Sequence, residues 1–296
     1  TRRSSDLDIM NSDNKKCLAL QKQISEKGWA KKLLGFQQEN GMWGGGLYSP
    51  KWISTTYTML LLKRLGFPAK HPAVEKACNI LIDKGFYSDG GINYIKSSEN
   101  SEICITGMIL GLLSYFDYQD DRLHSLKNYL FDHQMPDKGW NCLIFQGDHH
   151  SSFHTTIMVL EGLWEYEKRF PEFSKSIADK RAEAHEFLLQ HHLYKSDKTG
   201  KVVDAKMTRF SFPPRWRYDI MRAMDYFRDC NASYDERFTD AMELLIKKQN
   251  ADGSWNLQNP HKGRLFFEME KTGNPSVWNT LRGLRIMKWW NQLREK

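Results

Sequence analysis

The residues most suited to chemistry lie between Phe210 and Tyr226, where two prolines precede a dense group of charged and aromatic side chains. Asp219 is a candidate general acid. Arg215 and Arg217 are candidates for binding a diphosphate or carboxylate, since a guanidinium binds such a group through two parallel hydrogen bonds. The same string also fits a structural role, in which an aspartate and an arginine form an ion pair that braces the start of a helix. Both interpretations stay open from the sequence.

Pro213 and Pro214 predict that a helix begins near Trp216, because proline is well suited to the approach to a first helical turn. Trp216 and Asp219 would then occupy neighbouring positions on one helix face. Trp216 is a candidate substrate-binding residue or a core residue. Tyr218, next to Asp219, is a further catalytic candidate.

A loop built on glycine and an aromatic residue recurs five times along the chain. Each loop is followed by a helical pattern of small and apolar residues. The loops lie at 38–43, 89–94, 134–140, 200–204 (a divergent copy) and 249–255. The helices after them are expected to begin near Trp52, Glu102, Ser152, Trp216 and Ser276. Self-similarity of this kind is typical of a repeat architecture.

A second helical pattern separates each of these helices from the next loop. It covers residues 72–84, 121–133, 174–191 and 234–248 and carries charge on one side, so we expect it to form an outer layer around the more apolar helices. Small residues at Gly111, Gly162, Ala223 and Gly283 would let helices approach closely. Sustained alternation of apolar and polar residues is missing. The sequence therefore predicts an all-α fold of about five helix-loop-helix repeats, either an open superhelix or a closed ring.

Three of the loops resemble the QW motifs of squalene and oxidosqualene cyclases. They are Gln38-x-x-Gly41-x-Trp43, Gln134 to Gly139-Trp140, and Gln249-x-x-x-Gly253-x-Trp255. The resemblance covers roughly residues 28–290 and is to the superfamily of terpenoid cyclases and protein prenyltransferases. It also extends to uncharacterised bacterial proteins with prenyltransferase and squalene oxidase repeats, through the stretch after Phe210. It implies an α/α toroid with the active site at one end of an inner barrel.

In such a toroid the starts of the inner helices meet at the mouth of the central cavity. The residues expected there are the catalytic candidates Asp219, Glu102 and Tyr218 and the substrate-binding candidates Trp52, His150, Arg215, Trp216, Arg217, Trp278 and Asn279. Titratable and aromatic groups therefore gather at one end, as in a site with an apolar interior and a polar rim.

The acid of class II cyclases, an Asp-x-Asp-Asp string at the start of an inner helix, does not occur in the chain. The nearest string is Asp117-Tyr-Gln-Asp120-Asp121, which lies after an inner helix. It is better explained as the cap and acidic first turn of a helix that begins at Arg122. A standard class II cyclase is therefore not expected.

Protein prenyltransferases, the other branch of this resemblance, hold a catalytic zinc ion with Asp-x-Cys and a later histidine. Glu102-Ile-Cys104 resembles the first pair, with glutamate in place of aspartate, and His154 resembles the histidine. One carboxylate, one thiolate and one imidazole would leave an open zinc position. However, His154 lies one residue further from Gly162 than the family spacing, which rotates it by about 100° around the helix. Cys104 also fits a small buried helix residue.

Composition and charge exclude several other classes of protein. The chain has 296 residues and a net charge of +7, with basic residues spread among acidic ones, and it carries no nucleic-acid or dinucleotide motif. No apolar run reaches the length of a membrane span, and no secretory signal opens the chain. Five scattered cysteines without a C-x-x-C pair indicate a reduced, cytoplasmic protein. We expect residues 1–14 to be disordered or foreign to the domain and 15–296 to form one toroidal domain.

Together these observations predict a prenyltransferase-like or terpene-cyclase-like protein that binds or acts on a hydrophobic, isoprenoid-like small molecule in an aromatic-lined cavity. Zinc is the expected cofactor if there is one, and no obligate protein partner is indicated. Two alternatives stay open. A carbohydrate-active toroid would use Glu102 and Asp219 as its carboxylate pair, and a binding scaffold would have no catalytic residues.

Overall fold

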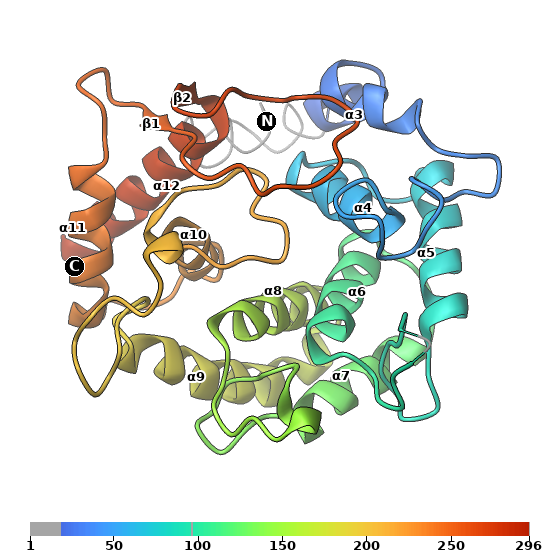
Figure 1. Ribbon diagram of the computed structural model, residues 1–296, viewed down its shortest axis with the longest axis horizontal. Coiled ribbons are helices and arrows are strands. Elements are labelled where there is room, and N and C mark those ends of the chain that lie inside the picture. The colour runs from blue at the N-terminus through green and yellow to red at the C-terminus, as the bar shows by residue number, and fades with distance from the viewer. Residues whose placement is uncertain (1–18, 96, 296) are drawn as a thin grey trace. The chain divides into compact units, whose positions relative to one another are not determined.

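The computed structural model describes residues 19–95 and 97–295, and these are mostly helical, which confirms the all-α prediction (Figure 1). The predicted disordered stretch 1–14 lies outside the described residues. Within them, the chain divides into two compact units. We call residues 19–185 with 263–266 the N-terminal unit, and residues 186–262 with 267–295 the C-terminal unit. Closure of the repeats into a ring and a single domain over 15–296 stay predictions.

The N-terminal unit contains helices of both predicted layers. Its elements are η2 (Gln23–Ser25), α3 (Gly28–Leu34), α4 (Thr55–Arg64), α5 (Pro72–Gly85), α6 (Ile103–Tyr115), α7 (Arg122–Asp132), η3 (Ile144–Gln146), α8 (Phe153–Arg169), η4 (Pro171–Phe173) and most of α9 (Ser174–Gln190). Helix α6 is buried over almost its whole length, whereas α5 buries one stripe, as expected for inner and outer helices.

Close contact between α6 and α8 depends on glycine (Figure 1). A Cβ atom on Gly162 would lie 2.3 Å from the carbonyl oxygen of Gly107, and one on Gly111 would lie 3.1 Å from the Cα of Gly162. These positions cannot take a larger residue without separating the helices. The predicted close approach at Gly111 and Gly162 is therefore confirmed.

The C-terminal unit is built on two helices that pack against each other, α10 and α12. Its elements are the end of α9, η5 (Ala205–Thr208), α10 (Ile220–Asp229), η6 (Glu236–Phe238), α11 (Thr239–Lys247), β1 (Trp255–Asn256), β2 (Pro275–Ser276) and α12 (Val277–Arg294). The two short strands are antiparallel, with Trp255 opposite Ser276. A Cβ atom on Gly283 would lie 2.6 Å from the ring of Trp255, so this glycine makes room for the buried indole of β1 and not, as was expected, for a second helix.

The three tryptophan loops share one set of contacts. Trp43, Trp140 and Trp255 are fully buried, and each indole Nε1–H donates to the backbone carbonyl ten residues earlier, at 2.7–2.8 Å. Each tryptophan backbone N–H donates to a threonine of the following helix, at 3.0–3.1 Å. The loop therefore joins the end of one helix to the first turns of the next.

The glutamine of the first loop is Gln37, and the expectation of Gln38 is wrong by one position. The Gln37 amide donates to the carbonyl of Gly41 at 2.9 Å, just as the Gln249 amide donates to Gly253 at 3.0 Å. In the middle loop Gln134 donates to Lys138, which takes the left-handed conformation (φ 78°) that glycine has in the other two. All three loops therefore share one spacing, with the left-handed residue four positions after the glutamine and the tryptophan two positions further on.

The acidic string after α6 is structural, but not as the predicted cap and acidic first turn: Asp121 is the N-cap residue of α7 without a side-chain capping bond, and the first turn contains no acidic residue. The carboxylate of Asp120 accepts a hydrogen bond from the backbone N–H of Arg122 at 2.9 Å and binds the guanidinium of the same residue. It thereby satisfies a free N–H at the start of α7. Among the described residues, no helix has the length and apolar character that a bilayer span needs.

Candidate functional site

The approach to α10 begins at Pro213 and Pro214, but the helix starts four residues later than Trp216. Arg215 adopts a left-handed conformation (φ 58°), and the chain turns once more before Asp219 caps the helix. Trp216 and Asp219 therefore lie in the segment before the helix, and the expectation that they share a helix face is wrong. A second turn after two prolines is not visible in a helical pattern.

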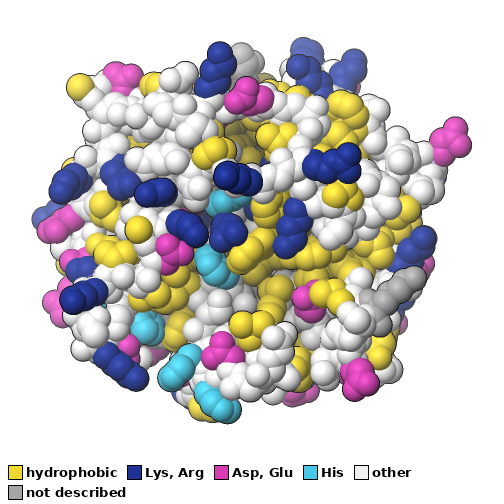
Figure 2. Space-filling view, viewed as in Figure 1, with side chains coloured by type: hydrophobic (Ala, Val, Ile, Leu, Met, Phe, Trp, Pro, Cys, Tyr) yellow, Lys and Arg dark blue, Asp and Glu magenta, His cyan; other side chains and the backbone are white. Residues whose placement is uncertain are grey.

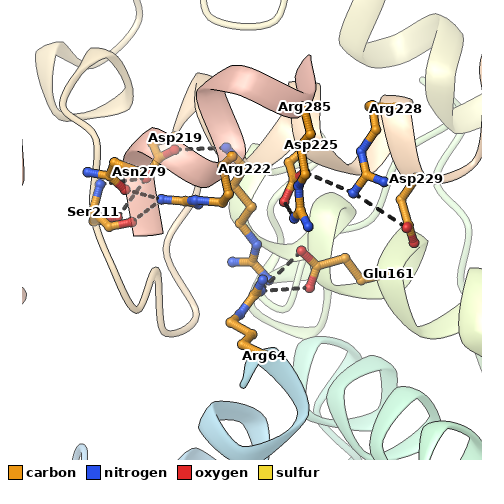
Figure 3. A network of polar contacts seen from close by, with 11 residues as sticks. Arg64, Glu161, Ser211, Asp219, Arg222, Asp225, Arg228, Asp229, Asn279 and Arg285 are labelled. Atoms are coloured by element: carbon orange, nitrogen blue, oxygen red, sulfur yellow. Dashed lines mark hydrogen bonds and ion pairs between the residues drawn. The ribbon is translucent and has the colours of Figure 1, made fainter. Parts of the chain in front are cut away.

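Asp219 is the centre of a buried group of polar side chains in the C-terminal unit (Figure 3). Its carboxylate is 1% exposed and accepts three hydrogen bonds, from the Ser211 hydroxyl at 2.6 Å, the Ser211 N–H at 3.2 Å and the Arg222 N–H at 2.9 Å. Arg282 of α12 donates to the Ser211 carbonyl at 2.5 Å and to the side chain of Asn279. We call Ser211, Asp219, Arg222, Asn279 and Arg282 the Asp219 network.

A second carboxylate of the same unit, Asp225, joins α10 to α12. Arg285 contacts it with both Nε, at 2.6 Å, and Nη2, and Arg228 contacts it at 3.1 Å (Figure 3). Burial by itself would raise the pKa of Asp225, but Arg285, Arg228 and Arg282 outweigh that effect and hold the pKa at about 2. Asp225 is therefore ionised at neutral pH and serves as a fixed counter-ion.

The aromatic candidates of this unit contact the protein itself. Trp278 stacks on Phe212 with ring centroids 4.6 Å apart, and the Arg217 guanidinium lies 4.4 Å from the centre of the Trp216 ring. The Tyr218 hydroxyl donates to the carbonyl of Leu193 at 2.5 Å, and burial raises its pKa. Asn279 is fully buried and donates to the carbonyl of Asn256 at 3.0 Å.

Glu102 of the N-terminal unit has a different environment. It is the N-cap residue of α6, yet its side chain makes no capping hydrogen bond. Its Oε2 atom is buried and has no hydrogen-bond partner among the described residues. Burial raises the pKa of Glu102, and the nearby Lys51 only partly offsets this. The structure thus holds a carboxyl group that keeps its proton more readily than an exposed glutamate.

Aromatic side chains lie around this carboxyl group. Tyr48 is close enough for Glu102 to affect its pKa, which is raised mainly by burial. The Tyr48 ring lies 5.2 Å from the ring of Tyr57, and Trp52 packs edge-on against Tyr57 at 4.8 Å. The ammonium of Lys51 lies over Tyr48 and Trp52, at 5.3 and 5.9 Å from the ring centres.

Two cysteines complete this group. The backbone N–H of Cys104, in the first turn of α6, donates to the sulfur of Cys142 at 3.1 Å, and Glu102 affects the pKa of both thiols. We call Tyr48, Lys51, Trp52, Tyr57, Glu102, Cys104 and Cys142 the Glu102 cluster.

The expected zinc ligands do not form a metal-binding group. In residues 19–95 and 97–295, no three His, Cys, Asp or Glu side chains are placed so that they could hold a metal ion, so Glu102, Cys104 and His154 do not fit this role together. His150, expected to bind substrate, is exposed in the loop before α8. Zinc binding stays a prediction, and no step below depends on it.

The sequence candidates are thus divided between two groups. Glu102, Cys104 and Trp52 belong to the Glu102 cluster, while Asp219 and Asn279 belong to the Asp219 network. Sequence reasoning missed Tyr48, Lys51, Tyr57 and Cys142 in the first group, and Ser211, Arg222 and Arg282 in the second. Arg282 and Arg285, three residues apart in α12, were a usable signal for buried polar contacts in this unit, because buried charges need partners.

Comparison with known proteins shows similarity at the level of fold. No family model matches the chain, and no curated protein matches it. A variant of the type II terpene cyclase MstE from Scytonema, in complex with its substrate geranylgeranyl dihydroxybenzoate, superposes with a TM-score of 0.55 and 15% identity over 92% of this chain and 72% of that one. A ligand-free variant of MstE matches with the same TM-score and 14% identity over the same shares. The chain therefore has a terpene-cyclase-like fold.

Proposed function

We propose that this protein binds a hydrophobic, isoprenoid-like molecule beside the Glu102 cluster and that Glu102 is its proton donor. The observation that carries the proposal is the buried Oε2 atom of Glu102, which has no hydrogen-bond partner among the described residues. A polar atom in that state is costly unless a ligand or a reaction uses it. The proposal is supported by the terpene-cyclase-like fold, because MstE takes a geranylgeranyl compound as substrate.

The surroundings of Glu102 suit a hydrophobic ligand. Trp52 and Tyr57 are buried and pack edge-on against each other, next to the ring of Tyr48, so the interior on this side is aromatic and apolar. Figure 2 shows apolar side chains gathered over the part of the N-terminal unit that holds α4 and α6 in Figure 1. An isoprenoid chain can thus pack against this part of the protein while its reactive end reaches the carboxyl group.

The state of Glu102 also limits the reaction. A carboxyl group with a raised pKa holds its proton at higher pH, but it is a weaker acid once it acts. Because the chain has no Asp-x-Asp-Asp string to strengthen the donor, protonation of an epoxide is easier than protonation of an unactivated alkene. We therefore favour an isoprenoid that carries an epoxide or a similarly basic oxygen.

We place Glu102 ahead of Asp219 and Tyr218 as the catalytic residue. The Asp219 carboxylate accepts three hydrogen bonds from the protein, and the Tyr218 hydroxyl donates to a backbone carbonyl. Either group would have to give up these bonds before it could act on a ligand.

Binding and conversion of geranylgeranyl dihydroxybenzoate and of its terminal epoxide test the proposal. Titration calorimetry should detect binding to the wild type, and Trp52→Phe should weaken it about 2- to 10-fold through loss of aromatic contact. Glu102→Gln should keep binding but abolish conversion of the epoxide. Because the proton goes to the epoxide oxygen, the product of the wild type should carry a new hydroxyl group, which NMR and mass spectrometry of the product detect.

Glu99→Gln is the matched control, because Glu99 is an exposed carboxylate three residues before Glu102. It should leave binding and conversion unchanged. Binding without conversion in the wild type would remove Glu102 as the acid but keep the ligand class. Absence of binding to either compound would overturn the proposal as a whole.

A further inference from the structure

Two of the described cysteines are in contact at the start of α6. The Cys104 backbone N–H donates to the Cys142 sulfur at 3.1 Å, and the two thiols lie close enough for each to shift the pKa of the other. They come from different parts of the N-terminal unit, since Cys104 is helical and Cys142 follows the buried Trp140. The repeat structure therefore brings together two thiols that are far apart in sequence.

The Cys142 sulfur lies where a thiolate is stabilised. It accepts from the backbone N–H of Cys104 at the N-terminal end of α6, and the Thr155 hydroxyl lies 3.6 Å away. The hydrogen bond from Cys104 is the largest influence on the Cys142 pKa and lowers it, while the pKa of Cys104 is raised. These contacts favour the thiolate at the Cys142 sulfur and the protonated thiol at Cys104.

Cys104 and Cys142 are half-buried residues. Cys78 in the same unit is fully buried, and burial raises the pKa of its thiol. Thiolate character together with access is what distinguishes a reactive cysteine from a structural one.

We propose that Cys104 and Cys142 form a redox-active dithiol that closes reversibly to an intramolecular disulfide next to Glu102. With hydrogen peroxide as oxidant, the Cys142 sulfur attacks one peroxide oxygen and becomes a sulfenic acid, while the other oxygen leaves as water. The Cys104 sulfur then attacks the Cys142 sulfur, loses its proton and releases a second water. The two sulfurs together lose two electrons and two protons, and peroxide is reduced to water.

The new bond would tie the first turn of α6 to the loop that carries Cys142. Because both thiols lie close enough to Glu102 to interact with it electrostatically, oxidation changes the surroundings of the proposed acid. The dithiol does not depend on the proposed function, since it requires only the two sulfurs and an oxidant.

Mass spectrometry of the full chain tests the dithiol. After reduction and removal of the reductant, brief treatment with hydrogen peroxide should lower the mass by two hydrogens, and dithiothreitol should restore it. A proteolytic digest should contain one crosslinked peptide pair, joining Cys104 to Cys142. Cys142→Ser should abolish the crosslink, and Cys104→Ser should leave a sulfenic acid on Cys142 that dimedone traps.

Cys230→Ser is the matched control, because Cys230 is also half-buried but belongs to the C-terminal unit. This variant should form the crosslink like the wild type. Circular dichroism of each variant establishes that it is folded. The proposal is overturned if folded protein, in which iodoacetamide labels both Cys104 and Cys142, is oxidised without forming this crosslink.

Discussion

Two carboxylates stand at the same position of equivalent helices and have opposite surroundings. Asp219 caps α10 and is saturated, with three hydrogen bonds from Ser211 and Arg222. Glu102 stands at the cap of α6 but makes no capping hydrogen bond, and one of its oxygens is buried without a partner among the described residues. One N-cap carboxylate therefore stabilises its helix, whereas the other leaves a buried oxygen unsatisfied.

The difference teaches how to rank candidates in a repeat protein. Both residues were candidates because each lies at the predicted start of a helix, but this position does not separate a structural carboxylate from a reactive one. The number of hydrogen bonds to the carboxylate separates the two. A carboxylate whose oxygens are all hydrogen-bonded within the protein stabilises the fold, whereas a buried oxygen without a partner destabilises it, and folding alone does not explain why it is kept. The following changes test this contrast, from the largest expected effect to the smallest.

Asp225→Asn should give the largest loss of stability. Removing the charge leaves Arg285 and Arg228 without their shared counter-ion between α10 and α12, and breaking a buried pair typically costs about 3–5 kcal/mol. Chemical denaturation at neutral pH measures the loss. Asp229→Asn is the control, since the more exposed Asp229 lies 3.5 Å from Arg228, and it should cost at most about 1 kcal/mol.

The Asp225 effect should also depend on pH. Its pKa is about 2 in the folded protein against an ordinary value of 3.8, so its contribution is complete above 3.8 and is lost as the pH falls through about 2. The difference in stability between wild type and Asp225→Asn should shrink over that range. A difference that stays constant would mean that the ion pairs are not its source.

Asp219→Ala should have an intermediate effect, about 2–4 kcal/mol, because it removes the cap of α10 and leaves the buried Ser211 hydroxyl without its acceptor. Glu102→Ala, which removes no capping bond, is the paired variant and should cost much less. The same denaturation measurement serves both. Equal losses would break the contrast between the two carboxylates.

Glu102→Gln should have the smallest effect on stability, and it should be favourable. The folded-state pKa of Glu102 lies above its ordinary value of 4.5, so wild-type stability is complete below that value and declines as the pH rises through the raised pKa. The variant does not titrate at this position. Its melting temperature should therefore gain on that of the wild type as the pH rises from 4 to 8, and a gain in the opposite direction would contradict the burial of the acid.

Much of the fold was accessible from sequence because it depends on periodicity. The starts of α6, α8 and α12 lie within one residue of the predicted positions, and the outer helices α5, α7 and α9 match to one residue at each end. Helix α4 begins three residues after the predicted Trp52, and α11 begins five residues after the predicted start of the last outer helix. The start of α10 was misplaced because the left-handed turn at Arg215 follows from packing around the segment, which no local pattern encodes. The tryptophan loops were found, but the exact glutamine required the hydrogen bond from Gln37 to Gly41.

The site was predicted less completely. Glu102 and Cys104 were identified from a short string, yet their neighbours Tyr48 and Cys142 come from two other loops, whose approach is a tertiary property. Asp219 was correctly expected near the start of a helix. Its hydrogen bonds with Ser211 could not be predicted, because they depend on a turn that the sequence does not reveal. The amino-acid sequence thus identifies candidate residues, whereas the side chains that contact them, and so determine their roles, are known only from the folded structure.

The four residues 263–266 belong to the N-terminal unit although they lie far beyond its main span in sequence. The carbonyl of Arg264 accepts the backbone N–H of Trp52 at 3.1 Å, and Phe266 stacks on Phe36 at 4.4 Å. During synthesis on the ribosome, residues 263–266 emerge more than two hundred residues after Trp52 and can contact it only then. We expect nascent chains shorter than this to leave Trp52 accessible to chaperones, and a protein cut after residue 262 to lose part of the wall beside Glu102.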